Sequence, residues 1–577
     1  MIQVAVLGYG TVGSGVVEVI NKNQKEVCKK AGVGIEVKYI LDLRDFPGDP
    51  MEQCVVHDFD VILNDPEVKI ICETMGGVNP AYEYSKKALL AGKSVCTSNK
   101  ELVANHGPEL IALAKANDCN YLFEASVGGG IPIIRPLNAS LTPERIDGIT
   151  GILNGTTNYM LTKMDEEGME YADVLAEAQA KGYAEKNPAA DVEGYDACRK
   201  IAILSSLVYG KTVYYEDIYT EGITKISKQD FLYAKAMKKS IKLLGMSKDI
   251  DGSCFAMVAP FMIRAEHPLY CVKDVFNGVC VHGNMLGTTM YYGRGAGKLP
   301  TASAVVSDVI DCAKHQGKFI FCFWEDENVK LASKDEMCWK FFVRVKGNEA
   351  DSNLMAAFGE TEIIRVPECA DEFAFVTDEI SEAEFVKRIA ELSKVCPHFH
   401  LSLQSGCDDT LVRMNRRYNT AEYKAGCDIL RKYFEHPAIT TDVIVGFPGE
   451  TEEEFAVTKQ YLEDIHFYEM HIFQYSKREG TKAAVMKDQI PEPVKKERSA
   501  VLLELEAKMS EEFREYYVGR EVTALMEEEW SFAGERYFVG YTKEYVKVAV
   551  KTDDDLTNQF TTGKIKECLT KDVYLMG

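Results

Sequence analysis

Residues 182–204, GYAEKNPAADVEGYDACRKIAIL, gather several groups able to do acid–base chemistry. Asp196 and Lys200 stand four residues apart, so they share one face if this segment is helical. A lysine whose pKa is lowered by desolvation or by a cationic neighbour can transfer a proton. The carboxylates of Glu185, Asp191 and Asp196 suit a ligand that carries an ammonium group. Taken alone, the Asp196–Lys200 pair equally fits an ordinary surface ion pair.

A strand, a glycine loop and a helix are expected at residues 2–20, IQVAVLGYGTVGSGVVEVI. In a GxGxxG loop, the first glycine allows a tight turn and the second lets a pyrophosphate approach the backbone. The third lets the helix pack on the strand, and the helix N-terminus favours the anion. The segment therefore predicts a dinucleotide site that contains Gly8, Gly10, Thr11, Val12 and Gly13.

The second expected strand, IEVKYILD, ends at Asp42. An acidic residue there binds a ribose 2′-hydroxyl and favours NAD, whereas the nearby Arg44 suits the 2′-phosphate of NADP. Both choices stay open from sequence. Further strands are expected within residues 68–77 and 93–104, and both end at the sheet edge where ligands bind. Lys100 lies at the end of the second, where a lone lysine is more often a surface residue.

Seven longer motifs resemble the homoserine dehydrogenase family over residues 1 to about 335. They are GYGTVG, ETMGG, TSNKELVA, FEASVGGGIPIIRPL, GILNGTTNYML, GYAEKNPAADVEGYDACRK and GRGAGKLPTASAVVSD. The resemblance implies NAD(P)-dependent interconversion of L-homoserine and L-aspartate 4-semialdehyde, in the biosynthesis of threonine, methionine and isoleucine. It also implies a homodimer joined through the sheet of the substrate domain, and a cytoplasmic location.

The resemblance assigns roles to several residues. It implies Lys200 as the proton-transfer residue and Lys100 as a second active-site lysine near the nicotinamide. Substrate contacts would come from Glu185, Asp196 and Asp191, and further cofactor contacts from Gly182 and Gly297. The family also binds a sodium ion in the FEASVGGGIP loop, which suits a hard cation. The ligands implied are Glu124, Val127, Gly129 and Ile131, and a plain glycine turn is the alternative.

The chain changes character after residue 335. Residues 336–385 resemble part of a small regulatory ACT domain, too short for a complete one. Residues 384–577 resemble the C-terminal part of a radical S-adenosylmethionine tRNA methylthiotransferase. The matching segments are CPHFHLSLQSGCDDTLVRMNRRY, AITTDVIVGFPGETEEEF and YEMHIFQYSKREGTKAAVM. Residues 512–577 resemble the TRAM β-barrel that ends those enzymes.

The tail lacks the CxxxCxxC triad that holds the iron–sulfur cluster of that class. We therefore expect no cluster there and read Cys396, His398 and His400 as part of a barrel strand. A partial barrel is expected to expose strand edges and an apolar lumen face. Residues 521–577 carry 7 Lys and Arg against 11 Asp and Glu, so we expect no RNA binding by the tail.

The composition is that of an ordinary globular protein, and the 17 cysteines, which include no CxxC pair, indicate thiols in a reducing compartment. The 577 residues carry a net charge of −23, which argues against a general nucleic-acid or anionic-membrane footprint. We expect an α/β chain with a Rossmann-type domain, an α+β substrate and dimerisation domain, a partial (β/α) half-barrel and a small β-barrel. The expected divisions are 1–130, 131–335, 336–385, 386–511 and 512–577. The alternatives to a dehydrogenase are a tRNA-modifying enzyme and a scaffold whose tail binds a partner without chemistry.

Overall fold

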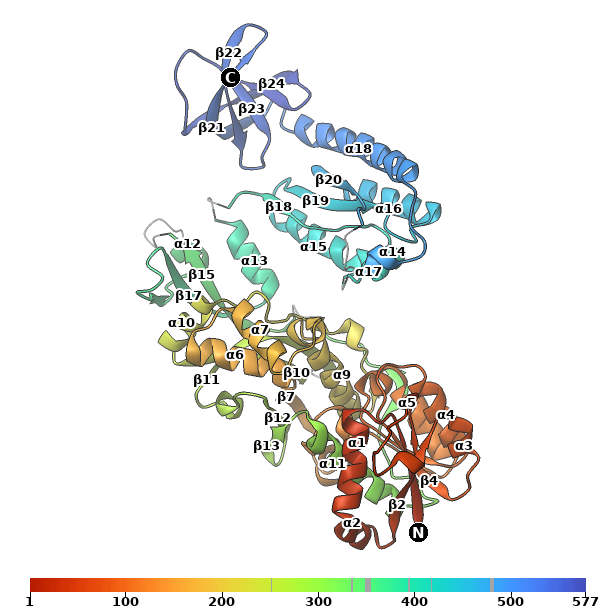
Figure 1. Ribbon diagram of the computed structural model, residues 1–577. Coiled ribbons are helices and arrows are strands. Elements are labelled where there is room, and N and C mark those ends of the chain that lie inside the picture. Colours follow the sequence, from red (N-terminus) through yellow and green to blue (C-terminus); the bar gives the residue numbers. More distant parts are fainter. Residues whose placement is uncertain (251, 334–335, 348–353, 393–394, 417, 478–481) are drawn as a thin grey trace. The chain divides into compact units, whose positions relative to one another are not determined.

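The computed structural model describes residues 1–577 except residues 251, 334–335, 348–353, 393–394, 417 and 478–481 (Figure 1). The chain forms two compact units, and each is described by itself. The first consists mainly of residues 1–337 and the second mainly of residues 377–577. The predicted division at residue 335 lies outside the described residues.

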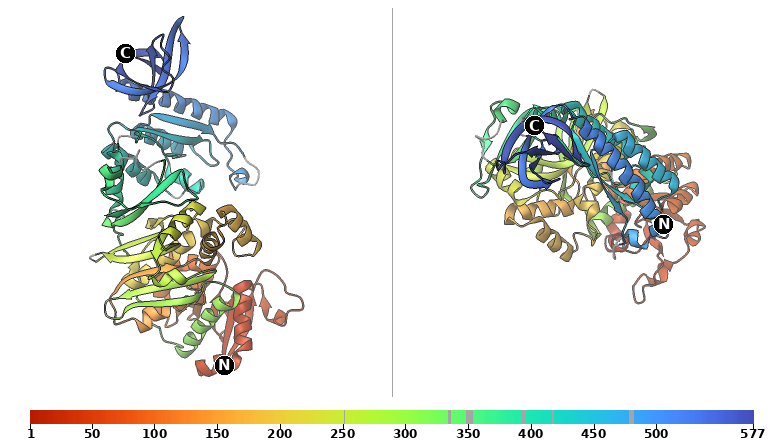
Figure 2. Two further views of the ribbon diagram at one scale, coloured as in Figure 1. Left: turned by 90° about the vertical axis from the view of Figure 1, so that its left-hand side faces the viewer. Right: turned by 90° about the horizontal axis from the view of Figure 1, so that it is seen from above.

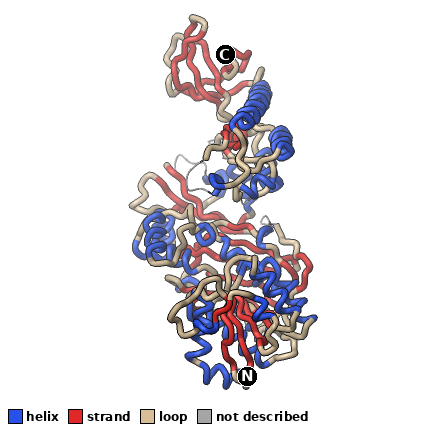
Figure 3. Tube along the Cα trace, turned by 45° about the vertical axis from the view of Figure 1, so that its right-hand side comes forward, coloured by secondary structure: helices blue, strands red, loops and turns tan. Residues whose placement is uncertain are grey.

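The first unit begins with a six-stranded sheet in the order β3-β2-β1-β4-β5-β6. All of its neighbouring strands are parallel, and the order is that of Rossmann folds. Figure 3 shows these strands as a red fan near the N-terminus. Their bounds are β1 Ile2–Leu7, β2 Ile35–Leu41, β3 Val55–Val56, β4 Val68–Glu73, β5 Ser94–Thr97 and β6 Tyr121–Leu122.

Helices cover both faces of this sheet, because its strands are apolar on both sides. One face packs against α1, α2 and α11, and the other against α3, α4 and α5. The bounds are α1 Thr11–Lys22, α2 Gln24–Ala31, α3 Phe59–Leu63, α4 Ala81–Leu90, α5 Lys100–Ala116 and α11 Lys298–Lys314. Helix α11 comes from far along the chain, so a cut at residue 130 would separate it from this sheet.

A second six-stranded sheet follows, in the order β13-β12-β7-β10-β11-β9. Helices α6 and α9 pack on it, and Asn154 caps the start of α6 by accepting a hydrogen bond from the amide of Thr157. The strands are β7 Ile146–Ile152, β9 Tyr219–Thr220, β10 Lys239–Ile250, β11 Ser253–Arg264, β12 Phe276–Gly283 and β13 Gly287–Arg294. The helices are α6 Gly155–Glu167, α7 Tyr171–Ala180, α8 Ala189–Val192, α9 Tyr195–Tyr209 and α10 Lys228–Ala236.

The chain also forms two small sheets. The strands β8 Lys211–Thr212 and β14 Glu325–Asn328 form a parallel pair. A three-stranded sheet has the order β15-β17-β16. Its strands are β15 Trp339–Lys346, β16 Ile363–Ile364 and β17 Glu372–Ile380, and the nearby helices are α12 Leu354–Phe358 and α13 Glu382–Ala390.

The second unit contains a parallel three-stranded sheet in the order β18-β19-β20. One face packs against α15, α16 and α18, with Val443 and Val445 of β19 in the core. The strands are β18 His398–His400, β19 Ala438–Val445 and β20 Glu469–Gln474. The helices are α14 Asp408–Arg413, α15 Thr420–Tyr433, α16 Glu452–Ile465, α17 Lys482–Val485 and α18 Glu492–Glu515.

The face of this partial barrel that turns away from the helices is partly polar and partly apolar. Successive strand residues point to opposite faces, so Thr440 and Asp442 point away from the helices. On that face His400 Nδ1 lies 3.0 Å from Thr440 Oγ1, and Ser402 Oγ donates to Asp442 Oδ2 at 2.9 Å. The same face also carries Ile444 and its neighbour Phe473, which is 54% exposed, so the expected apolar surface is present at this end of the strands.

The chain ends in a closed barrel in which the strands follow the order β21-β22-β23-β25-β24 (blue in Figure 2). The strands are β21 Glu521–Phe532, β22 Glu535–Thr542, β23 Lys547–Lys551, β24 Gln559–Thr570 and β25 Val573–Met576. The structure confirms the predicted fold class: a Rossmann-type sheet, a second α+β region, a partial parallel barrel and a small closed barrel.

Candidate active site

The glycine loop after β1 has the geometry of a dinucleotide turn. Gly8 has a φ of +89°, which favours glycine, and a Cβ on Gly13 would lie 1.9 Å from the Gly8 carbonyl oxygen. Gly10 faces open space, and Thr11 and Val12 begin α1, whose N-terminal amides point to the same edge. The loop can therefore hold a pyrophosphate against the backbone.

Asp42 and Arg44 form one cluster beside this loop. Asp42 accepts hydrogen bonds from the amide of Tyr9 at 2.8 Å and from Arg44 Nε at 3.0 Å. The Arg44 guanidinium holds the pKa of Asp42 well below its usual range, despite partial burial. Asp42 is largely shielded whereas Arg44 is exposed, so both groups are placed to meet the ribose end of a cofactor.

The buried side chains of Asp196 and Lys200 meet the half-exposed side chain of Lys100 in one cluster. Asp196 Oδ1 lies 2.5 Å from Lys100 Nζ, and Asp196 Oδ2 lies 2.8 Å from Lys200 Nζ. Lys200 also donates to the carbonyl oxygen of Leu153 at 2.8 Å. Lys100 begins α5, directly after β5, and the other two belong to α9. The cluster therefore lies at the same edge of the parallel sheet as the glycine loop.

The two lysines have different electrostatic surroundings. Burial lowers the pKa of Lys200, and the attraction of Asp196 only partly opposes this effect. Burial also acts on Lys100, but its ion pair with Asp196 raises its pKa above the usual value. The pKa of Asp196 is low despite burial, because both lysines stabilise its charged form. Paired groups shifted in opposite directions are typical of acid–base sites.

Asn154 is a member of this site that the sequence did not single out. Its amide nitrogen donates to Asp191 Oδ1 at 2.7 Å and to Asp196 Oδ2 at 2.9 Å. Burial raises the pKa of Asp191, and its proximity to Asp196 adds to the shift. The signal available in the sequence was only the NGTT run, since an asparagine before a helix reads first as a cap.

Glu185, Gly182 and Gly297 lie outside this hydrogen-bonded cluster. Glu185 and Gly182 are exposed on the loop that follows α7, and Gly182 has a φ of +71°. Within the described part of the chain, no hydrogen bond or ion pair joins the Glu185 side chain to Asp196 or Lys200. Gly297, with a φ of +124°, immediately precedes α11.

The Glu124 carboxylate is buried and bound to backbone. It accepts hydrogen bonds from the amides of Ile133 at 2.6 Å, Ile134 at 2.9 Å and Arg135 at 2.7 Å. Oε2 accepts only one of these amides, so it keeps an acceptor position that a cation could share with the backbone carbonyls of Val127, Gly129 and Ile131. The loop packs closely on the 293–297 segment, because a Cβ on Gly129 would lie 2.2 Å from the Gly295 oxygen.

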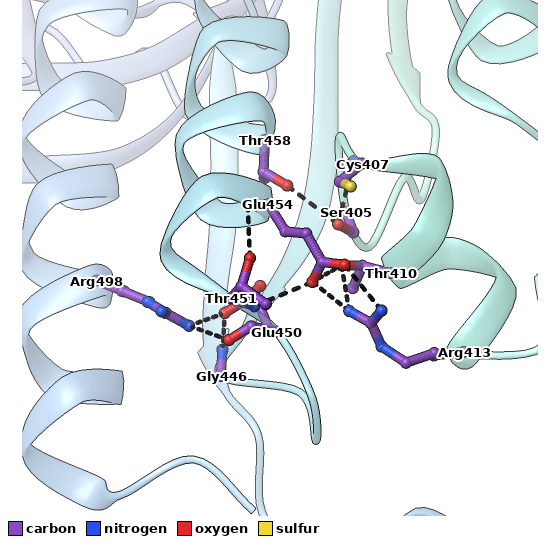
Figure 4. Close-up of polar contacts among 10 residues, drawn as sticks. All are labelled: Ser405, Cys407, Thr410, Arg413, Gly446, Glu450, Thr451, Glu454, Thr458 and Arg498. Atoms are coloured by element: carbon purple, nitrogen blue, oxygen red, sulfur yellow. Dashed lines mark hydrogen bonds and ion pairs between the residues drawn. The ribbon is translucent and has the colours of Figure 1, made fainter. Parts of the chain in front are cut away.

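Cys396 and His398, near the beginning of the tail, share no side-chain partner among the residues that the structure describes. His398 stacks on Tyr545 with ring centroids 4.3 Å apart, and Cys396 is exposed. In the described residues, the group that best matches metal ligands is Cys407, Asp409 and Glu454, whose ligand atoms lie within 4.8 Å of one another. Figure 4 shows Glu454 turned to Arg413, at 2.8 Å from its Nη1. Its charge is already neutralised.

The loop after β19 is held by a second ion pair. Glu450 accepts a hydrogen bond from the Gly446 amide at 2.7 Å and pairs with Arg498 of α18 at 2.7 Å (Figure 4). Both side chains are buried, so this pair fixes the loop against the long helix.

Across the described chain, none of the helices is both long and apolar enough to span a bilayer.

A parallel dinucleotide-binding sheet with a lysine–aspartate–lysine cluster at its ligand edge defines a nicotinamide-dependent oxidoreductase. Comparison with known proteins agrees. The family "Homoserine dehydrogenase, NAD binding domain" matches residues 8–124, and "Homoserine dehydrogenase" matches residues 132–310. The chain belongs to the homoserine dehydrogenase family. The "Radical SAM superfamily" also matches, over residues 351–462, which confirms the expected change of character.

This chain covers most of the length of its relatives. Homoserine dehydrogenase of Bacillus subtilis (strain 168) is 42% identical over 54% of this chain and 73% of its own. That of Helicobacter pylori is 40% identical over 60% of this chain and 81% of its own. The solved structure from Thiobacillus denitrificans has a TM-score of 0.62 at 34% identity and covers 68% of this chain and 94% of its own.

Proposed function

We propose that Lys200 carries the hydroxyl proton when this dehydrogenase interconverts L-homoserine and L-aspartate 4-semialdehyde. The observation that carries this assignment is the Lys100–Asp196–Lys200 cluster at the ligand edge of the cofactor sheet, in which Asp196 and Lys200 are buried. A lysine whose pKa is lowered by burial has the larger neutral fraction, so Lys200 suits a base. Bound NAD(P) supplies the hydride acceptor or donor.

Lys100 takes the complementary role in this proposal. Its raised pKa keeps it an ammonium ion, which stabilises negative charge on the substrate oxygen as the carbonyl and alkoxide interconvert. Asp196 and Asp191 hold the substrate ammonium group, and Asn154 orients both carboxylates. Glu185 joins them from the exposed loop when substrate is bound. These four polar residues would determine homoserine binding.

The cofactor site of the proposal comprises the glycine loop with Gly8, Gly10, Thr11, Val12 and Gly13, together with Asp42, Arg44, Gly182 and Gly297. The exposed Arg44 beside Asp42 supports use of NADP as well as NAD. A sodium ion would be held through the backbone carbonyls of the 124–131 loop. Glu124 would belong to the same ligand set, because the three amides that donate to its carboxylate leave one acceptor position on Oε2.

A homodimer through the substrate domain is also proposed. The β12–β13 hairpin exposes apolar side chains, with exposed fractions of 82% for Met285, 59% for Leu286 and 55% for Tyr292. Exposed apolar side chains gathered on one hairpin are typical of a protein interface. Sedimentation velocity of the full chain tests this, and a monomer at micromolar concentration would contradict it.

Substrate binding tests the site directly. Asp196→Ala and Glu185→Gln should raise the KM for homoserine while the KM for NAD(P) stays near the wild-type value. Glu193→Gln is the matched control, because this residue lies in the same segment outside the cluster. If the cofactor KM rose and the homoserine KM did not move, the substrate and cofactor sites would be assigned the wrong way round.

The tail carries a separate proposal. We infer that residues 386–577 fold without supporting radical chemistry, as a partial barrel followed by a TRAM-like barrel, and that residues 336–385 form a partial ACT-like segment. The five cysteines after residue 360 are Cys369, Cys396, Cys407, Cys427 and Cys568, and none lies within eight residues of another. A methylthiotransferase activity is therefore not favoured.

A further inference from the structure

Glu73 is a fully buried carboxylate at the ligand edge of the cofactor sheet. It is the last residue of β4, and its exposed fraction is 0%. One carboxylate oxygen accepts a hydrogen bond from the amide of Met75 at 2.7 Å. The other accepts from the hydroxyl of Thr97 at 2.5 Å. The carboxylate thus joins the loop after β4 to the last residue of β5.

The hydrogen bonds continue from Thr97 to the helix that bears Lys100. The Asn99 amide donates to Thr97 Oγ1 at 2.9 Å. The Asn99 side chain then caps α5, accepting from the Leu102 amide at 3.1 Å, and donates to the Gly77 carbonyl at 2.7 Å. Lys100 is the next residue, so this sequence of hydrogen bonds ends at the base of the lysine that pairs with Asp196.

The loop after β4 also holds the dinucleotide turn. Thr74, which follows Glu73, donates through its hydroxyl to the carbonyl oxygens of Leu7 and Gly8, at 2.9 Å each. The same residue's amide donates to Leu7 at 3.0 Å. Glu73 therefore lies between two structures that the reaction needs: the turn that receives the cofactor and the helix start that presents Lys100.

Glu73 has no charged partner in the part of the chain that the structure describes. Among the residues that the structure describes, no lysine, arginine or histidine forms an ion pair with it. Burial raises its pKa to about 7, although the hydrogen bonds from Thr97 and Met75 oppose the shift. A buried carboxylate without a cation is costly. A neutral residue would fill the same space at lower cost, so packing alone does not account for a carboxylate here.

We propose that Glu73 is a positioning residue for the dehydrogenase reaction: it fixes the separation between the cofactor turn at Gly8 and the Lys100 end of α5. This inference rests on the proposed role of Lys100. Glu73 is fully buried and so is not open to a ligand, and it acts through Thr97 and Asn99. A displacement of about 1 Å at a reacting group can lower a rate by about 100-fold. If these hydrogen bonds are lost, the distance between the cofactor turn and the Lys100 end of α5 is less well fixed. The loss should therefore lower kcat more than it lowers cofactor affinity.

Three variants of the full chain test the proposal. Glu73→Gln removes the charge, and Thr97→Val removes the hydroxyl that links Glu73 to Asn99. Each should lower kcat about tenfold or more, with the Kd for NADPH, measured by its fluorescence, within about threefold of wild type. The double variant should lose no more than the worse single variant, because both changes break the same connection. Thr97→Ser keeps the hydroxyl and should keep kcat.

The matched control is Glu109→Gln. Glu109 lies on α5, the helix that begins with Lys100, and pairs with Lys86 at 2.8 Å. It takes no part in these hydrogen bonds, so the kcat of Glu109→Gln should equal that of wild type. If Glu73→Gln does not fold, as judged by circular dichroism, the comparison of Thr97→Val with Thr97→Ser tests the proposal instead. Equal kcat for Thr97→Val and Thr97→Ser would overturn the proposal. So would losses in kcat that multiply in the double variant.

The role of Lys100 is tested separately by Lys100→Ala. If Lys100→Ala kept full kcat, the proposed function of the lysine would be wrong whatever Glu73 does. If Lys100→Ala were severely impaired while Glu73→Gln and Thr97→Val kept full kcat, only the positioning role would fail. A fall in NADPH affinity equal to the fall in kcat would make Glu73 a support for cofactor binding and would also overturn the proposal.

Discussion

Lys200→Met is the sharpest test of the proposed chemistry. The substitution removes the amine and keeps an unbranched side chain of similar length. Asp196 would still have Lys100 at 2.5 Å and Asn154 at 2.9 Å, so its charge would not be left unpaired. The main structural loss is the donor to the Leu153 carbonyl oxygen. We therefore expect a stability loss of about 1–3 kcal/mol. This is less than the roughly 3–5 kcal/mol that is lost when removing one partner leaves a buried charge unpaired.

The effect on turnover should be much larger. A general acid–base residue contributes about 10²–10⁴-fold to the rate. This corresponds to roughly 3–5 kcal/mol in the activation barrier. NAD(P)H absorbance with L-homoserine gives kcat and KM, and NADPH fluorescence gives cofactor affinity, which should stay near normal. Lys242→Met is the matched control, since Lys242 is also buried but donates to the Val272 carbonyl oxygen, away from this cluster.

Two results would refute the reasoning. Nearly full kcat in Lys200→Met would remove Lys200 from the mechanism. A similar loss of kcat in Lys242→Met would show that removing any buried lysine from this domain disables the enzyme, so that the Lys200 result carries no information about proton transfer.

Four further predictions follow from the same structure. Arg44→Ala should raise the KM for NADP about tenfold relative to that for NAD, because it removes a charge-assisted contact to the 2′-phosphate; an unchanged ratio would contradict this role. A chain ending at residue 380 should keep the kcat of the full chain, and a folded but inactive product would assign the tail a part in the site. Anaerobic reconstitution with iron and sulfide should give no stoichiometric iron in the tail and no 5′-deoxyadenosine. Production of 5′-deoxyadenosine that is lost in Cys396→Ala would reverse that reading. The raised pKa of Glu73 means that its ionisation destabilises the folded state of the wild type as the pH rises. The free energy of unfolding of Glu73→Gln should therefore increase relative to wild type by up to about 3 kcal/mol between pH 5 and 8. A melting-temperature difference between the two proteins that does not vary with pH would refute this.

The fold was largely predictable, because its signals are local. The strand–glycine–helix pattern and Asp42 predicted the first parallel sheet, and the structure has the corresponding strand order. Spacing placed Asp196 and Lys200 on one helix face, and their 2.8 Å contact agrees. Lys100 joined them only through tertiary packing, about a hundred residues away in sequence, and no periodicity could show this.

Other features depended on side-chain partners that spacing does not reveal. Glu124 reads in sequence as a cation ligand, and its carboxylate also binds three backbone amides. Asn154 reads as a helix cap, and it also joins two carboxylates. The polar groups on the open face of β18 and β19 were not foreseen, since the sequence does not show which face of these strands the helices cover.

Because α11 packs on the first sheet, the cofactor domain cannot finish folding until α11 has been synthesised. Gly15 of α1 lies against this helix, since a Cβ there would be 2.8 Å from the Lys298 oxygen. Cys96 and Cys312, on β5 and α11, have their sulfurs 3.6 Å apart. A ribosome that has made the last strand of this sheet must add about 190 more residues before α11 is complete, which takes roughly 10–40 s at the usual elongation rate. During that interval the apolar side of α1 is uncovered. The nascent cofactor domain should therefore be a chaperone client until the substrate domain has been translated.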